Sequence, residues 1–172
     1  MSQKLTILFA PMDGVGHVNA CIGVAERLRD RGHKIVFAIG IGWKGKLEKE
    51  GFIEELLVDP NNNFKEDNSG DPVKKYVEEL LTSGILSGIP PKEKLKQLLG
   101  SGWFQKMIDL TKALCPTYQQ IVDKHKPNLI IIDHFVAIPP ILKSGIPWVL
   151  LFSGNPLRMF GSEELPPAGF GM

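Results

Sequence analysis

The sequence predicts an α/β fold with a doubly wound parallel sheet. The first observation is a set of short runs that are apolar without alternation, as expected of strands buried on both faces. These runs lie at 5–10, 34–39, 55–58, 129–133 and 148–152. The second observation is that helix-like segments separate the runs, so that strand and helix alternate along the chain. We expect these helices at about 19–31, 44–50, 73–86, 92–99, 104–125 and 137–144.

The individual elements follow from their local patterns. The first strand leads into a helix that carries Ile22, Ala25 and Leu28 on one side at helical spacing. The long helix at 104–125 contains Pro116, where a kink or a break is expected because proline lacks the N–H that a helix needs. Two segments are loops by composition, at 59–72 and in the Gly- and Pro-rich tail at 153–172.

Length and composition indicate a single domain spanning 1–172. With 172 residues, of which 43% are hydrophobic and 23% charged, the chain can bury a real core. A compact domain usually closes with an element that docks on its core, whereas this chain stops inside a Pro- and Gly-rich run. We therefore expect a further unit downstream.

Charge and cysteine content exclude several classes of function. The 20 Lys and Arg residues against 19 Asp and Glu residues leave a net charge of +1, without a block of like charge. This balance gives no reason to expect nucleic acid or an anionic membrane surface as a partner. Cys21 and Cys115 lie in helix-like segments and are interpreted as small apolar residues, not as a disulfide or a metal site. No segment has transmembrane length and the first apolar run is too short for a signal peptide, so we expect a cytoplasmic protein.

The turn DGVGHVN at 13–19 carries the main functional signal. Two glycines between a first strand and a helix suggest a dinucleotide site, but the third glycine position holds Asn19. No acidic residue follows the second strand to bind a ribose, and no Gly-Lys-Ser/Thr follows the turn. What remains is a turn, with Gly14 and Gly16 in structural roles, that brings His17 to the carboxyl edge of the sheet. This position favours acid-base chemistry.

Asp133 is the expected partner of His17. It ends the apolar run LIIID, so its carboxyl group emerges at the same carboxyl edge. In the common strand order 3-2-1-4-5, the first and fourth strands are neighbours, which places the two side chains next to each other. The aspartate would fix the tautomer of the imidazole and stabilise its protonated form.

Two long stretches resemble the N-terminal half of the UDP-glycosyltransferase superfamily, whose GT-B fold has two Rossmann-like domains. They are GHVNACIGVAERLRDRGHKIVFAIG at 16–40 and KPNLIIIDHFVAIPPILKSGIPWVLLFSGNP at 126–156. The resemblance covers essentially the whole chain, and its motifs occur in the family's order. One departure is Ala20, where the family often has proline. Another is that no second Rossmann-like domain, which holds the UDP, is present in the sequence.

The resemblance implies a function and roles for individual residues. It implies inverting transfer of a sugar from a UDP-sugar to a small lipophilic acceptor, in conjugation of a xenobiotic or a secondary metabolite. His17 would be the general base and Asp133 its partner. Ser153, together with Gly16, would lie near the donor sugar and diphosphate. The chain itself is expected to bind no cofactor and no metal, and to depend on a C-terminal donor-binding domain in cis or in trans.

An apolar pocket for the acceptor is a further expectation. Its candidate lining residues are Met12, Trp103, Phe104, Phe135, Met159 and Phe160, although such residues are also ordinary core residues. Two alternatives to a catalytic half remain open: a non-catalytic module that binds a hydrophobic small molecule, and the acceptor subunit of a two-chain glycosyltransferase. An NAD-dependent oxidoreductase is disfavoured by the missing third glycine and acidic residue.

Overall fold

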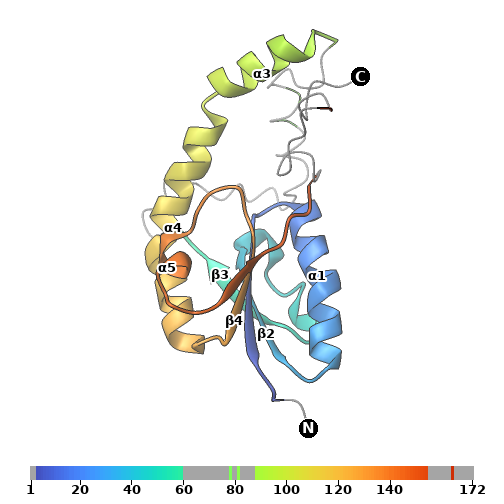
Figure 1. Ribbon diagram of the computed structural model, residues 1–172, viewed down its shortest axis with the longest axis vertical. Coiled ribbons are helices and arrows are strands. Elements are labelled where there is room, and N and C mark those ends of the chain that lie inside the picture. The colour runs from blue at the N-terminus through green and yellow to red at the C-terminus, as the bar shows by residue number, and fades with distance from the viewer. Residues whose placement is uncertain (1–2, 60–77, 79–80, 82–87, 155–163, 165–172) are drawn as a thin grey trace.

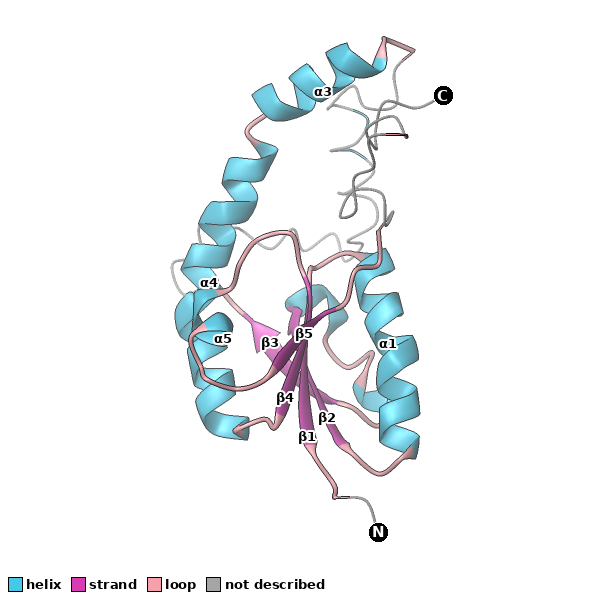
Figure 2. Ribbon diagram, in the orientation of Figure 1, coloured by secondary structure: helices cyan, strands magenta, loops and turns pink. Residues whose placement is uncertain are grey.

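The computed structural model, described here for residues 3–59, 78, 81, 88–154 and 164, is a parallel sheet between two layers of helices (Figures 1 and 2). The sheet has five strands in the order β3-β2-β1-β4-β5, with every neighbouring pair parallel. The strands are β1 (Thr6–Pro11), β2 (Lys34–Gly40), β3 (Ile53–Leu57), β4 (Leu129–Asp133) and β5 (Trp148–Leu150). The predicted fold class and the predicted neighbours of β1 are therefore confirmed.

Helices lie on both faces of this sheet. They are α1 (Val15–Asp30), α3 (Pro91–Gly100), α4 (Trp103–His125) and α5 (Pro139–Leu142), with short 3-10 helices η1 (Ile41–Trp43) and η2 (Glu48–Glu50). α1 packs on one face, whereas α4 and α5 pack on the other (Figure 2). α3 and the first turns of α4 extend past the carboxyl ends of the strands (Figure 1). No helix in the described part of the chain is long and apolar enough to cross a membrane.

The central strands explain why the apolar runs lack alternation. Successive side chains of a strand point to opposite faces. Ile7 and Phe9 of β1 belong to the core under α1, whereas Leu8 and Ala10 belong to the core under α4, and all four are buried. Since both faces are covered by helices, both sets of side chains must be apolar.

The two edge strands differ from that expectation. The sequence predicts β5 to be buried on both faces, but Trp148, Val149 and Leu150 are 46%, 51% and 41% exposed. Among the described residues, β5 pairs with β4 alone and lies at the end of the sheet, so no described strand lies on its other side. At the other edge, every residue of β3 is only partly buried. Strand position in the sheet, which an apolar run does not reveal, decides this burial.

Three helical segments also differ from the prediction. α1 begins at Val15, four residues before the expected start, so that His17 lies in its first turn. The expected helix at 44–50 is replaced by separate 3-10 turns, because the Glu54 carboxylate accepts the backbone N–H groups of Gly45 and Leu47, each at 2.6 Å. α4 continues through Pro116 without a break. The expected helix at 73–86 falls almost entirely outside the described residues.

Candidate functional site

His17 is delivered to the carboxyl edge of the sheet by a tight turn between β1 and α1. Gly14 precedes the helix with extended backbone, and its carbonyl accepts the N–H of Val18 at 2.9 Å. A Cβ on Gly14 would lie 3.3 Å from Cδ2 of the His17 ring, so the glycine allows the ring to approach the turn closely. Gly16 is helical and a Cβ there would meet nothing within 4 Å. The structure therefore requires glycine for close packing at position 14 but not at position 16.

Asp133 is the last residue of β4 and lies directly beside the end of β1. The register pairs Pro11 with Asp133, and the Asp133 carbonyl accepts the N–H of Met12 at 2.7 Å. The Asp133 side chain is only 2% exposed, and its Oδ1 lies 3.1 Å from Nδ1 of His17. The contact expected from the strand order is therefore present. The other carboxylate oxygen, Oδ2, is buried and has no hydrogen-bond partner among the described residues.

Ser153 is a second polar residue in contact with the His17 ring. It follows β5, whose pairing with β4 is extended by the N–H of Leu151, which donates to the Ile132 carbonyl at 2.7 Å. The Ser153 Oγ lies 2.9 Å from Nδ1 of His17, the same nitrogen that faces Asp133. The family resemblance draws attention to Ser153, but it does not predict the contact with His17. Residues from the ends of three strands thus meet at one imidazole.

Two residues that follow Asp133 shape the surroundings of the ring. Phe135 contacts His17 edge to face, with ring centroids 5.3 Å apart, and is 46% exposed. This position beside the candidate base is compatible with the predicted contact to an acceptor, which stays a prediction. His134 accepts the N–H of Val136 through Nδ1. Burial lowers the pKa of His134, and the nearby His17 adds to this effect.

Three of the other acceptor candidates lie in the described residues, and none of them has a hydrogen bond or a ring contact with His17. Met12 lies in the turn after β1, and its backbone N–H donates to the Asp133 carbonyl. Trp103 and Phe104 contact each other, with ring centroids 4.9 Å apart, at the start of α4. Met159 and Phe160 lie outside the described residues. Their role in acceptor binding stays a prediction.

Asp13 is an acidic residue at the carboxyl edge of the sheet that was not predicted as a site residue. Its Oδ1 accepts the indole N–H of Trp43 at 2.9 Å. Partial burial raises the pKa of Asp13, and the hydrogen bond from Trp43 and the charge of Lys46 oppose this rise. A Cβ on Gly40 would collide with the Asp13 carboxylate. Asp13 could have been found from the sequence, because it lies beside Gly14 in the turn that follows the first strand of a parallel sheet.

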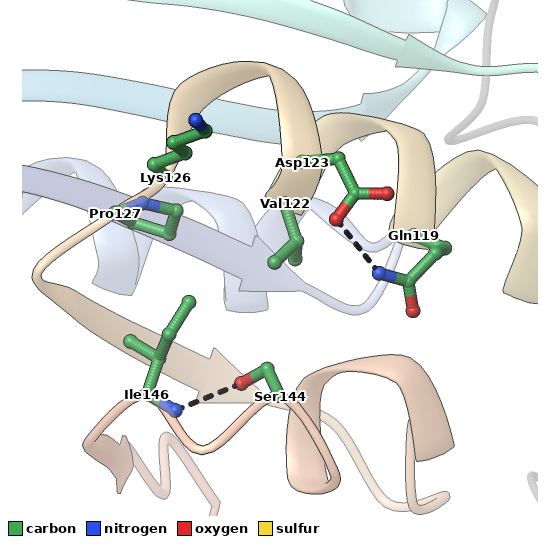
Figure 3. Close-up of a pocket in the computed structure, with 7 residues that line it drawn as sticks. All are labelled: Gln119, Val122, Asp123, Lys126, Pro127, Ser144 and Ile146. Atoms are coloured by element: carbon green, nitrogen blue, oxygen red, sulfur yellow. Dashed lines mark hydrogen bonds between the residues drawn. The ribbon is translucent and has the colours of Figure 1, made fainter.

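A hollow of about 500 Å³ lies elsewhere, at the amino ends of β4 and β5 (Figure 3). Its lining residues come from the end of α4 and from the segments that precede the two strands: Gln119, Val122, Asp123, Lys126, Pro127, Ser144 and Ile146. Because His17 lies at the carboxyl ends of the strands, this hollow is not the expected acceptor pocket. Within the described ranges, no three His, Cys, Asp or Glu residues are grouped so that they could hold a metal ion.

Comparison with solved structures places this fold among glycosyltransferases. CalG4, the calicheamicin glycosyltransferase, matches 95% of this chain at 16% identity with a TM-score of 0.55. The spinosyn rhamnosyltransferase SpnG matches 89% at 15% identity and 0.55, and the Streptomyces sp. SF2575 glycosyltransferase SsfS6 matches 85% at 17% identity and 0.53. The chain has the fold of a GT-B N-terminal half. At these identities, the likeness establishes the fold and not the activity.

The matched region is a minor part of each neighbour. The chain spans 34% of CalG4, 36% of SpnG and 38% of SsfS6. SpnG and SsfS6 have also been solved in complex with thymidine diphosphate. No family model matches the chain, and no curated protein matches it.

Proposed function

We propose that this chain is the acceptor-side half of a glycosyltransferase that moves a sugar from a nucleoside diphosphate to a hydroxyl group of a small lipophilic acceptor. The observation that carries the proposal is the 3.1 Å contact between His17 Nδ1 and the buried Asp133 carboxylate, at the carboxyl edge of a GT-B-type sheet. Ligands of open parallel α/β sheets bind at this edge.

The dyad has the geometry of an oriented general base. An ionised carboxylate can only accept hydrogen bonds, so the proton of a neutral His17 ring belongs on Nδ1. The lone pair then lies on Nε2, at the other side of the ring. Nε2 takes the proton of the acceptor hydroxyl while its oxygen attacks the anomeric carbon and the bond from that carbon to the diphosphate breaks. Attack opposite the leaving group inverts the configuration, and proton removal of this kind contributes about 10²- to 10⁴-fold.

The positive charge that develops on the His17 ring is disfavoured by the N-terminal end of α1 and stabilised by Asp133. His17 lies in the first turn of α1, where the helix dipole disfavours a cation by about 0.3–1 kcal/mol. Two opposite charges about 4 Å apart attract each other by about 4 kcal/mol near a protein surface, and Asp133 lies 3.1 Å from Nδ1 and is almost completely buried. The carboxylate therefore outweighs the helix end, which is why the proposal assigns the proton-accepting role to the pair and not to His17 alone.

The donor is proposed to be a pyrimidine nucleoside diphosphate sugar, held by a C-terminal domain in cis or by a separate chain. The resemblance in sequence suggests UDP, whereas two structural neighbours were solved with thymidine diphosphate. Both nucleotides therefore belong in the test. Phe135, exposed beside the imidazole, is the proposed apolar contact for the acceptor.

The test is a transfer assay with the chain joined to the C-terminal half of SpnG or SsfS6. UDP-sugars and thymidine diphosphate sugars are combined with phenolic acceptors, and products are detected by mass spectrometry. We expect a glycosylated product that is lost in His17→Ala and kept in His33→Ala, which changes a histidine at the opposite edge, bonded to the Leu5 N–H. Transfer that does not depend on His17 would contradict the proposal.

A further inference from the structure

Two oxygens close to Nδ1 of His17 carry an inference about Ser153. Asp133 Oδ1 and Ser153 Oγ lie 3.1 and 2.9 Å from the same nitrogen. A ring that carries a proton on Nδ1, neutral or cationic, has that N–H hydrogen-bonded to Ser153 Oγ and facing Asp133 Oδ1. Ser153 can then act only as an acceptor of that N–H, because an imidazole nitrogen that bears a proton cannot accept from a hydroxyl.

The reverse arrangement is disfavoured by the carboxylate. If the hydroxyl donated to a bare Nδ1, the lone pair of that nitrogen would face the lone pairs of Asp133 Oδ1 at 3.1 Å. Asp133 Oδ1 would then face no N–H of His17, and Asp133 Oδ2 has no partner among the described residues. A buried carboxylate left without donors is costly. The geometry therefore assigns the acceptor role to Ser153.

We propose that Ser153 is a positioning residue for His17: its Oγ accepts the Nδ1–H that faces Asp133, holds the ring with Nε2 as the free base, and stabilises the protonated ring. This inference rests on the proposed role of His17. It differs from the role near the donor sugar and diphosphate that the family resemblance implies for Ser153. The two acceptors also reach the ring from different elements, Asp133 from β4 and Ser153 from the segment after β5.

The other groups around the ring do not supply this contact. His134, which follows Asp133, uses Nδ1 to accept from its own segment. Cys21, one helical turn after His17, is fully buried, and burial followed by the Asp133 charge raises the pKa of its thiol to about 12. Phe135 contacts the ring through its edge or face alone. Among these neighbours, Asp133 and Ser153 are therefore the groups that set the proton on Nδ1.

The test is an NMR titration of the imidazole nitrogens in the isotope-labelled chain, which needs neither donor nor acceptor. Ser153→Thr and Ser153→Val have nearly the same shape and differ in the hydroxyl group. We expect Thr to leave the midpoint of the His17 titration unchanged and Val to lower it by about 0.5 pH unit, roughly a threefold change in protonation. Ser153→Ala should behave as Val does. The signals of His33, at the opposite edge of the sheet, are an internal reference for the fold.

Two results would overturn the inference. An unchanged midpoint in both Val and Ala variants would mean that the hydroxyl does not stabilise the protonated ring. A raised midpoint would mean that it donates to Nδ1 instead. In the transfer assay, Ser153→Val should lower kcat a few-fold and leave the acceptor KM unchanged. Because the titration is independent of catalysis, failure of the glycosyltransferase proposal and failure of this inference are distinguishable.

Discussion

At the residue scale, substitutions of His17 and Asp133 distinguish a general base from a residue that only contacts the acceptor. In an enzyme with a donor half supplied, we expect His17→Ala to lower kcat by about 10²-fold or more and to leave acceptor binding nearly unchanged, since proton removal acts on the transition state. Asp133→Asn should cost less, because an amide can still orient the ring but carries no charge to stabilise it. Steady-state kinetics with varied acceptor provide the measurement.

The separate effects of His17→Ala on kcat and on the acceptor KM distinguish a general base from a binding contact. If His17→Ala raises the acceptor KM and spares kcat, the imidazole is a binding contact. Gly23→Ala is a suitable control in the same helix, because a Cβ there would meet nothing within 4 Å. It should leave both constants close to those of the unmodified enzyme.

At the scale of elements, Glu55 joins β3 to the end of α4. Its Oε1 accepts from Lys124 Nζ at 2.7 Å and lies 2.6 Å from His125 Nε2, and the Glu55 side chain is 17% exposed. Burial by itself would raise the pKa of Glu55, but the hydrogen bonds from Lys124 and His125 outweigh it and lower this pKa. The contact therefore favours the charged carboxylate and stabilises the docking of α4 on the edge strand.

The lowered pKa gives this contact a defined pH dependence. A carboxylate with a depressed pKa in the folded state contributes stability above its unfolded pKa, near 4.5 for glutamate, and loses it as pH falls through the folded pKa. Glu55→Gln should lower the free energy of unfolding by about 1 kcal/mol at neutral pH. The difference should shrink below the unfolded pKa. Urea unfolding at several pH values tests this, with Glu48→Gln, at an exposed position, as the control that should change little.

Sequence reasoning also succeeds and fails at the scale of elements. Strands β1, β2 and β4 are predictable because helices cover both of their faces, and the neighbouring ends of β1 and β4 then bring His17 to Asp133. The start of α1 is missed because Gly14 and Gly16, which normally disfavour helix, precede its apolar stripe. The contact of Ser153 with His17 is also missed, since it depends on the path of the segment after β5 beside the end of β4, and no local pattern encodes that path.

At the scale of the whole molecule, the chain spans about a third of each neighbour, 34–38% of its length. A positioned base contributes about 10²- to 10⁴-fold, whereas enzymes accelerate their reactions by about 10⁶-fold or more. The missing factor must come mainly from groups that bind the donor and stabilise the departing diphosphate. In the proposed arrangement these groups belong to the donor half.

We therefore predict that the purified 172-residue chain transfers no measurable sugar from UDP-sugars or thymidine diphosphate sugars to phenolic acceptors. The same chain should still bind an acceptor, because Phe135, the proposed apolar contact, is exposed beside His17 at the carboxyl edge. Mass spectrometry of the reaction mixture and acceptor-induced NMR shifts at these two residues measure the two halves of the prediction. Turnover by the chain alone that is lost in His17→Ala would show that these residues suffice for catalysis, and the division of labour between two halves would then be wrong.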